Sequence, residues 1–298
     1  MAGVVPRGRF VWHELYTTDP EGAIAFYKKV IGWGIKSWEE DATYRMWAKG
    51  NAFFGALLPL AESDRLLGAR PHWLSYVSTP DVNATVQQAK SLGARVKVEP
   101  QEAPTVGRWA VLRDPQDVTF AVFTPAPSST GRADDPPLGD YTWHELTTRD
   151  WKSAWEFYHA LFGWEQDEAM DMGPAGVYQM FRRGGGKAPI GGMYNASQGQ
   201  PAQWLPYARV ASADQAGSIV AQAGGRVAAG PMDVPNGRVT ICIDPQGAGF
   251  AVHAIAAAAS AKPARKPAAA KKKAKPAKSK IRPKAKAKAK SKRKGRKR

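Results

Sequence analysis

Cysteine and long apolar stretches are scarce in this 298-residue chain. Its single cysteine, Cys242, rules out a disulfide framework and is typical of a reducing compartment. No run approaches the roughly 20 apolar residues that a membrane helix needs, and the first 15 residues lack the apolar core of a secretion signal. Cys242 lies in the apolar stretch RVTICIDP, which favours core packing over a nucleophilic role. We therefore expect a cytoplasmic globular protein.

Acidic residues are absent from the C-terminal segment. Residues 262–298 hold 20 Lys and Arg and no Asp or Glu, which leaves 23 basic and 26 acidic residues in 1–261. The formal net charge of +17 therefore belongs to the tail, and the rest of the chain is mildly acidic. The segment also lacks aromatic residues, so it cannot bury enough apolar surface to offset its ordering entropy. We predict that residues 257–298 are disordered.

A flexible polycation binds a phosphate backbone by releasing condensed counterions, without reading the sequence. We therefore predict that the tail holds the protein on nucleic acid, with an association with the nucleoid as a further expectation. Other polyanions satisfy the same physics and stay open as alternatives. The expected contacts are Lys271, Lys272, Lys273, Lys275, Lys284, Lys286, Lys288, Lys290, Lys292, Arg293 and Lys294.

The remaining chain is an internal repeat. WHELYTTDPEGAIAFYKKVIGW at 12–33 returns as WHELTTRDWKSAWEFYHALFGW at 143–164, and GRWAVLRDPQDVTFAVF at 107–123 returns as GRVTICIDPQGAGFAVH at 237–253. The spacing stays at 130 or 131 residues, so the copies have almost no net insertion. The Pro-, Ser- and Asp-rich residues 126–140 read as a linker. We predict one domain over 1–125 and a second over 141–256, and two complete units in one chain are consistent with a monomer.

Each copy predicts an α+β fold. Residues 10–17 alternate like a strand, and Asp19 with Pro20 is a helix start that leads to a stop at Gly32. A second helix over about 82–92 ends at Gly93, with short strands before and after it. Each repeat therefore contains two βαβββ modules, and the second repeat has Asp150 and Gly163 at the corresponding helix ends.

The helix signature, the DPQG turn at 244–247 and the paired βαβββ modules together resemble the vicinal oxygen chelate superfamily. This superfamily contains glyoxalases, extradiol dioxygenases and bleomycin-resistance proteins, and the chain is most similar to its tandem glyoxalase-like members. The resemblance implies two cup-shaped mixed sheets, each with a pocket that in many members holds a divalent metal. The Lys-Ala-Pro tail resembles that of linker histones.

The resemblance also implies where four metal ligands would lie in each cup. The first falls on Trp12 and Trp143 and the last on Ala121 and Ala251, none of which is a ligand. The second lies near FFGALLP and PIGGMYN, which offer no carboxylate, and the third lies near PHWLSY and AQWLPY. We therefore predict no cofactor, while a divalent metal stays open as an alternative. Its runner-up ligands are His13, His72, His144 and Gln203.

Other residues are candidates for the pocket itself. Alternation along the first strand puts Trp12 and Glu14 on one face and His13 on the other. Glu14 and Glu145 are candidate general bases, or else are bound to backbone or arginine. The predicted pocket residues are Trp12, Trp73, Arg108, Trp143, Trp204 and Arg238.

Three functions remain open at this point. The first is a protein with two metal-free small-molecule-binding cups, held on nucleic acid by its tail. The second is a metal-dependent lyase or dioxygenase with a non-standard site. The third is a nucleoid-associated protein whose folded part recruits partners.

Overall fold

The computed structural model describes residues 7–41, 43–126 and 136–256. The basic tail predicted to be disordered and most of the predicted linker lie outside the described residues. The described residues belong to one compact unit. In the part of the chain that the structure describes, no helix is long and apolar enough to cross a membrane.

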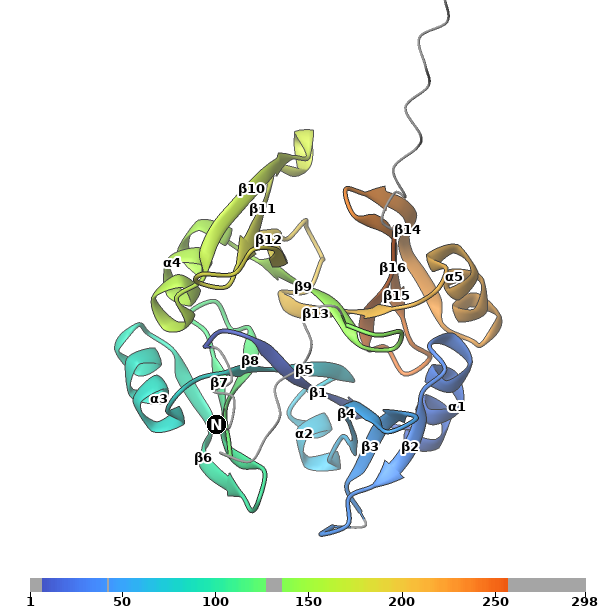
Figure 1. Cartoon of the computed structure of the whole chain (residues 1–298), viewed down its shortest axis with the longest axis horizontal. Coiled ribbons are helices and arrows are strands. Elements are labelled where there is room, and N and C mark those ends of the chain that lie inside the picture. The colour runs from blue at the N-terminus through green and yellow to red at the C-terminus, as the bar shows by residue number, and fades with distance from the viewer. Residues whose placement is uncertain (1–6, 42, 127–135, 257–298) are drawn as a thin grey trace, which may run out of the picture. The chain divides into compact units, whose positions relative to one another are not determined.

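Both repeats follow the predicted order of strands and helices (Figure 1). The first repeat consists of β1 (Phe10–Thr17), α1 (Pro20–Val30), β2 (Gly34–Ser37), β3 (Arg45–Lys49), β4 (Ala52–Pro59), α2 (Glu62–Leu66), β5 (His72–Ser78), α3 (Val82–Ser91), β6 (Arg95–Ala103), β7 (Gly107–Arg113) and β8 (Thr119–Pro125). The second consists of β9 (Tyr141–Thr148), α4 (Trp151–Phe162), β10 (Glu165–Asp171), a 3₁₀ turn (Gly173–Ala175), β11 (Val177–Arg182), β12 (Pro189–Asn195), β13 (Gln203–Arg209), α5 (Ala213–Gln222), β14 (Arg226–Val234), β15 (Gly237–Ile243) and β16 (Gly249–Ile255).

The predicted helix ends are confirmed. The Asp19 carboxylate accepts a hydrogen bond from the Gly22 backbone N–H, and Asp150 does the same for Lys152. Such N-caps satisfy donors that the first turn of a helix leaves without a partner. Gly163 ends α4 with a φ of 65°, the left-handed conformation that glycine adopts at little cost.

Each repeat forms its own eight-stranded mixed sheet, as predicted. The strand orders are β2-β3-β4-β1-β5-β8-β7-β6 and β10-β11-β12-β9-β13-β16-β15-β14. At the centre of the first sheet β1 pairs antiparallel with β5 and parallel with β4. The two sheets therefore have the same topology, each with one βαβββ module on either side of its centre.

The near-constant repeat spacing hides insertions that cancel. Gly55 and Gly191 occupy equivalent positions in β4 and β12, 136 residues apart, whereas the two histidines of β1 and β9 are 131 apart. In its first module the second repeat has a longer first hairpin strand, β10 in place of β2, and a longer connection between β11 and β12. It then lacks a counterpart of α2, which lies between β4 and β5 of the first repeat.

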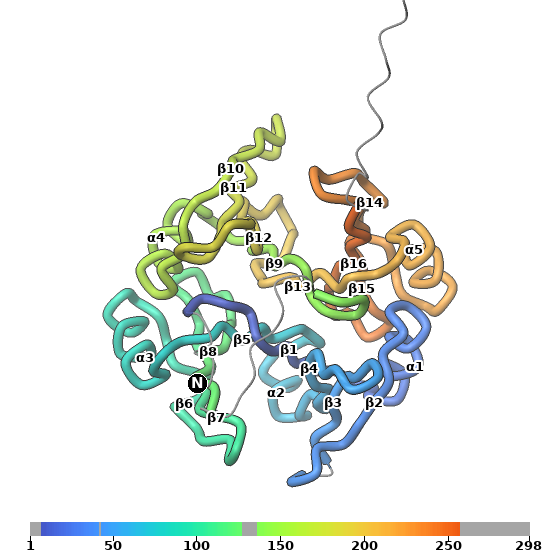
Figure 2. Tube along the Cα trace, in the orientation of Figure 1, coloured from blue at the N-terminus to red at the C-terminus, as the bar shows by residue number. Residues whose placement is uncertain are grey.

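The hydrophobic cores are shared between the repeats. One cluster joins Val86 and Phe120 of the first repeat to Tyr158 and Phe162 of the second. The other cluster reverses the roles and joins α1 to α5 and β16. In Figure 1, α1 lies beside α5 and α3 beside α4, and both pairs are in contact. Figure 2 shows the central strands β5 and β13 next to each other between them.

Matched hydrogen bonds connect the repeats inside these cores. The Tyr27 hydroxyl donates to Asp244 at 3.1 Å, and the Tyr158 hydroxyl donates to Asp114 at 3.0 Å. Each aspartate belongs to the DPQ turn of the other repeat. Because each turn binds a helix of the opposite repeat, neither repeat completes its own interior.

Candidate functional site

The central strands β1 and β9 divide the His-Glu pairs between two faces of each sheet. His13 packs with the core between the repeats, and Glu14 points to the opposite face, away from the helices. The same holds for His144 and Glu145 in β9. Period-two alternation of the strand accounts for this division. Each cup, defined here as the helix-free face of one sheet, therefore contains one buried glutamate.

Three tyrosines surround Glu14 in the first cup. The Tyr76 and Tyr16 hydroxyls donate to Glu14 Oε2 at 2.7 and 3.0 Å, and Tyr44 donates to Oε1 at 2.7 Å. Trp12 Nε1 donates in turn to the Tyr44 hydroxyl at 3.0 Å. These four aromatic residues come from β1, β5 and the approach to β3, so the sheet itself assembles the network.

Glu145 has a corresponding set of tyrosines in the second cup. Tyr207, the equivalent of Tyr76, donates to Glu145 Oε2 at 2.9 Å. The hydroxyls of Tyr178 and Tyr194 also stabilise the ionised glutamate. Trp143 Nε1 donates to the Tyr178 hydroxyl at 2.8 Å, which repeats the contact of Trp12 with Tyr44.

Burial governs the charge state of both glutamates. It raises the pKa of Glu14 and of Glu145 above the usual 4.5, and the tyrosine hydrogen bonds reduce this rise. The same burial raises the pKa of Tyr194 to about 12, so that the hydroxyl stays protonated. The result is a carboxyl group that can accept a proton inside a ring of phenolic donors.

Aromatic and aliphatic side chains cover the rest of the first cup. Half-buried Trp12, Trp109 and Phe123 pack around the buried Leu74 and Val111. The second cup is built from Leu205, Val239 and Ala251 with the half-buried Trp143 and Ile241. Both cups are therefore mainly apolar around one polar centre.

Two tryptophans expected in the pocket lie elsewhere. Trp73 and Trp204 are on the helix face of β5 and β13, where their indole N–H groups donate to the Tyr27 and Tyr158 hydroxyls at 3.1 Å. Each tryptophan lies three residues before a cup tyrosine, Tyr76 or Tyr207, on the same strand. Since alternate side chains point to opposite faces, the tryptophans point into the core. Of the four predicted tryptophans, only Trp12 and Trp143 face the cups.

Arg108 and Arg238 also lie away from the cups. Arg108 donates to Glu102 at 2.5 Å and to Asn83 of α3 at 3.2 Å. Arg238 is paired with Asp214 of α5 and with Asp233. Both arginines therefore bind carboxylates outside the cups, and Arg108 also donates to the Asn83 amide oxygen of α3. The glutamates of the cups bind tyrosine rather than the expected arginine or backbone.

The histidines occupy two different environments. His13 Nε2 and His144 Nε2 are 2.8 Å apart in the core between the repeats, which puts both far from the cup face. His72 lies at the edge of the first cup, stacked on Tyr16 with ring centroids 5.2 Å apart, and its Nδ1–H donates to the Arg70 carbonyl at 2.7 Å. Gln203 has the same strand position in the second repeat.

A family model described as the Glyoxalase/Bleomycin resistance protein/Dioxygenase superfamily matches residues 9–122 and 141–252. The chain belongs to this superfamily. Its curated relatives include CFP32 of Mycobacterium bovis, a glyoxylase by name, which is 38% identical over 122 residues. That match spans 40% of this chain and 45% of the relative, less than half of its length. The anthracycline biosynthesis protein DnrV of Streptomyces peucetius is 25% identical over 82% of this chain and 92% of its own length.

Solved structures of the superfamily share the fold. The Mn(II)-bound glyoxalase of Novosphingobium aromaticivorans has a TM-score of 0.59 at 16% identity and covers 84% of this chain and 82% of its own. The extradiol ring-cleaving dioxygenase of B. fuscum has a TM-score of 0.61 at 16% identity, over 85% of this chain and 73% of its own. At this identity the similarity extends to the fold alone.

The superfamily includes a metal-bound enzyme, the Mn(II)-bound glyoxalase, so the donor atoms that each cup offers bear on metal binding. Such a cation takes several oxygen or nitrogen ligands from converging side chains. Besides the tyrosine hydroxyls, the strands around Glu14 present Trp12, Ala56, Leu74 and Ala121 to the cup. Across residues 7–41, 43–126 and 136–256, no group of three or more His, Cys, Asp or Glu side chains could hold a metal ion. Glu14 and the tyrosine hydroxyls that donate to it are thus the polar groups at the centre of the first cup.

The tyrosines are the site residues that sequence reasoning missed. Tyr76 and Tyr207 recur in the matched segments WLSY and WLPY, three residues after each tryptophan. This repeat was a usable signal, because alternation puts each tyrosine on the face opposite its tryptophan. Tyr44 and Tyr178 gave no such signal, since they lie in segments where the two repeats differ in length.

Proposed function

We propose that each cup binds a flat, largely apolar small molecule without a metal ion. One observation carries this proposal: in both repeats a buried glutamate, hydrogen-bonded to tyrosine, forms the polar centre of an otherwise apolar cup. Small-molecule sites combine mostly apolar walls with a few placed polar groups in this way. The aromatic rings give a planar ligand a stacking surface, and the Glu-Tyr centre fixes its polar substituent.

The relative that matches both repeats, DnrV, supports a polycyclic aromatic ligand. DnrV is named for anthracycline biosynthesis, and it aligns with both repeats of this chain. Anthracyclines carry a planar fused-ring system with hydroxyl and carbonyl groups on its edges. Such edges match a site in which tyrosine hydroxyl oxygens accept and a carboxyl group exchanges protons.

Titration of the protein with daunorubicin, followed by fluorescence quenching, tests this proposal. We expect saturable binding that weakens about 10-fold or more in Glu14→Gln with Glu145→Gln, because hydrogen bonds to charged groups contribute about 1.5–3 kcal/mol. The matched control is Arg108→Gln with Arg238→Gln, which alters charges on the helix side and should leave binding unchanged. Equal binding by wild type and the double glutamate variant would contradict the proposal.

Metal reconstitution separates this function from metal-dependent catalysis. We expect that purified protein incubated with Mn, Fe, Co, Ni or Zn retains less than stoichiometric metal, since each cup offers a single carboxylate. Stoichiometric metal that disappears in Glu14→Gln with Glu145→Gln would instead place an ion at the glutamates and favour an enzyme of the lyase or dioxygenase type.

We further propose that the basic tail binds nucleic acid without sequence preference. The supporting observation is its composition: 20 positive residues and no acidic ones in residues 262–298. Deleting residues 258–298 should remove binding to duplex DNA at low salt, while residues 1–257 keep their thermal unfolding transition. Duplex binding by the shortened protein as tight as that of the full chain would contradict this proposal.

A further inference from the structure

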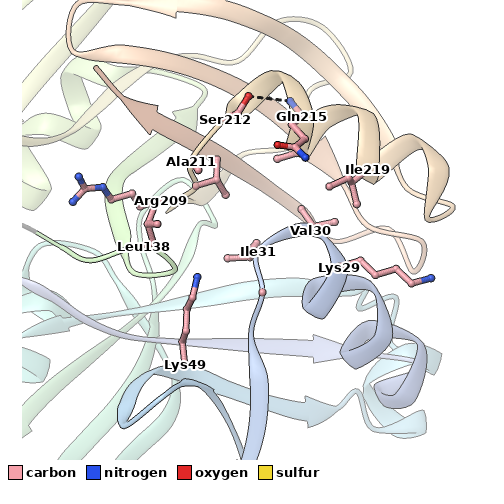
Figure 3. A pocket seen from close by; sticks show the side chains of 13 residues that line it. Lys29, Val30, Ile31, Lys49, Leu138, Arg209, Ala211, Ser212, Gln215 and Ile219 are labelled. Atoms are coloured by element: carbon pink, nitrogen blue, oxygen red, sulfur yellow. Dashed lines mark hydrogen bonds between the residues drawn. The ribbon is translucent and has the colours of Figure 1, made fainter. Parts of the chain in front are cut away.

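A cavity of about 260 Å³ lies between the end of α1 and the start of α5, away from both cups (Figure 3). Its walls include the apolar side chains of Val30, Ile31, Leu138 and Ile219. Leu138 is 44% exposed, so the cavity opens to solvent along an apolar edge. The volume is below the 300–1,000 Å³ typical of drug-sized ligands, which points to a small metabolite.

The other repeat contains the same corner in a filled form. Between the end of α4 and α3, Arg7 Nη2 donates to the Leu161 carbonyl at 2.5 Å, and Gln88 Nε2 donates to the Ala160 carbonyl at 2.9 Å. The corners are equivalent, because Trp164 donates to the Gly8 carbonyl at 2.7 Å as Trp33 donates to the Gly139 carbonyl at 2.8 Å.

The substitutions between these corners explain the cavity. At the repeat spacing of 131 residues, Arg7 corresponds to Leu138 and Gln88 corresponds to Ile219. Neither leucine nor isoleucine can donate a hydrogen bond. The carbonyl oxygens of Lys29 and Val30, equivalent to those of Ala160 and Leu161, therefore receive no donor from the described residues.

These carbonyl oxygens favour a cationic donor. They belong to the last turn of α1, where carbonyl groups without partners carry the negative end of the helix dipole. At the filled corner a guanidinium occupies this place. A ligand that replaces it in the open corner needs an N–H donor with positive charge.

Lys49 adds the opposite requirement. Its side chain passes along Gly139 and brings the ammonium group beside Gly32, where a Cβ atom would stand 3.6 Å from Lys49 Nζ. Figure 3 shows Lys49 directed into the cavity, the Gln215 side chain entering it from α5, and Lys29 directed away. Lys49 repels a simple cation and attracts a carboxylate. A molecule with both charges can bind the carbonyl oxygens and Lys49 Nζ at once, because both lie at the C-terminal end of α1.

We propose that this cavity binds a small zwitterion with an apolar side chain, of the class of the free aliphatic amino acids. The ammonium group of the ligand donates to the Lys29 and Val30 carbonyl oxygens, and its carboxylate accepts from Lys49 Nζ. The apolar side chain packs against Ile219 and Leu138. This site is independent of the cups and of the function proposed for them.

Isothermal titration of the full chain with L-leucine tests the proposal. Isoamylamine and 4-methylpentanoate, which keep one charge each, are the comparison ligands. We expect leucine to bind and each single-charge compound to bind at least 10-fold more weakly. Absence of leucine binding, or an equal affinity for isoamylamine, would overturn the proposal.

Three variants sharpen this test. Lys49→Met should weaken leucine binding at least 10-fold, and Leu138→Arg with Ile219→Gln should abolish it by filling the cavity as Arg7 and Gln88 fill its counterpart. Lys28→Met is the matched control, because this exposed side chain of α1 is not part of the cavity wall, and the affinity of this variant should stay within 2-fold of wild type. Unaltered binding in both the Lys49 variant and the filled variant would locate the ligand elsewhere.

Discussion

The two cups reach a similar polar centre by different routes. In the first cup the third tyrosine, Tyr16, belongs to β1, two residues after Glu14. In the second cup the third tyrosine, Tyr194, belongs to the neighbouring strand β12. Tyr16 of β1 pairs with Leu58 in the first sheet, whereas Tyr194 of β12 pairs with Thr147 of β9 in the second, so the tyrosine of this pair is on the glutamate's own strand in one cup and on the neighbouring strand in the other.

This exchange shows which property of the cup is held constant. Position 16 and position 147 are equivalent, but one carries tyrosine and the other threonine. The shared property is a third phenolic hydroxyl near the glutamate, and no single strand is required to supply it. Three tyrosine hydroxyls bind the glutamate in each cup, and in the second cup Gln200 Nε2 also donates to the Tyr194 hydroxyl at 2.6 Å.

Separating the repeats should have the largest effect on this pair of cups. Residues 7–126 alone expose the core surface that α4 and α5 cover in the intact protein. We expect no folded monomer of either repeat, because each core combines residues of both. Sedimentation and thermal unfolding of each isolated repeat measure this. A cooperative transition in a monomeric single repeat would show that the cores are not shared in the way described.

The buried glutamates should make stability depend on pH. Since folding raises their pKa, the unfolded chain loses these protons near pH 4.5 while the folded protein still holds them. The free energy of unfolding therefore falls as the pH rises from about 4.5 through the raised values, by up to about 1.4 kcal/mol per pH unit for each group.

Comparison with Glu14→Gln and Glu145→Gln isolates this contribution by urea unfolding between pH 4 and 8. Asp114 and Asp244 also have raised pKa values through burial, but they are present in every variant and cancel. Each variant should lose part of the decline in stability. The same pH dependence in wild type and in the double variant would mean that the glutamates do not titrate in this range.

Removing the third tyrosine hydroxyl of a cup should lower the free energy of unfolding by a smaller amount, and the loss should differ between the two cups. Tyr16→Phe deletes a hydrogen bond of 3.0 Å to Glu14, so we expect a loss of about 1–2 kcal/mol in the free energy of unfolding. Tyr194→Phe should lower the free energy of unfolding by a smaller amount, because the short hydrogen bond of its hydroxyl is the one from the exposed Gln200. The combined change Tyr16→Thr with Leu58→Tyr moves the hydroxyl to the strand used by the second cup. It should recover part of the loss, and no recovery would argue that the strand origin matters.

The smallest effect is expected at the edge of the first cup. His72→Gln copies Gln203 of the second repeat and removes the stacking on Tyr16. Stability should change by no more than about 0.5–1 kcal/mol, and daunorubicin affinity should change only a few-fold. A large loss of binding would instead assign His72 a direct contact with the ligand.

Local signals predicted much of this fold. The caps at Asp19 and Asp150, the stop at Gly163 and the separation of Glu14 from His13 all follow from residues close together in the chain. The tyrosine network does not, because Tyr76 is 62 residues from Glu14 and meets it only through the pairing of β5 with β1. The prediction that Trp73 and Arg108 line the pocket was wrong for a related reason. Tryptophan and arginine occur on either face of a strand, and the residues that pack against them from other elements determine which face they occupy.

The contact between His13 and His144 has a consequence for symmetry. A hydrogen bond between two Nε2 atoms needs a proton on one and a lone pair on the other, so two neutral imidazoles joined in this way are different tautomers. His144 Nδ1 faces the Ile190 carbonyl at 3.4 Å, which puts its proton there and leaves His13 as the donor. In a dimer of two identical chains, either Nε2 atom could carry this proton with equal free energy. Because the repeats differ in sequence around the two histidines, the proton stays on His13 Nε2, and the molecule is asymmetric at the contact where its repeats are most alike.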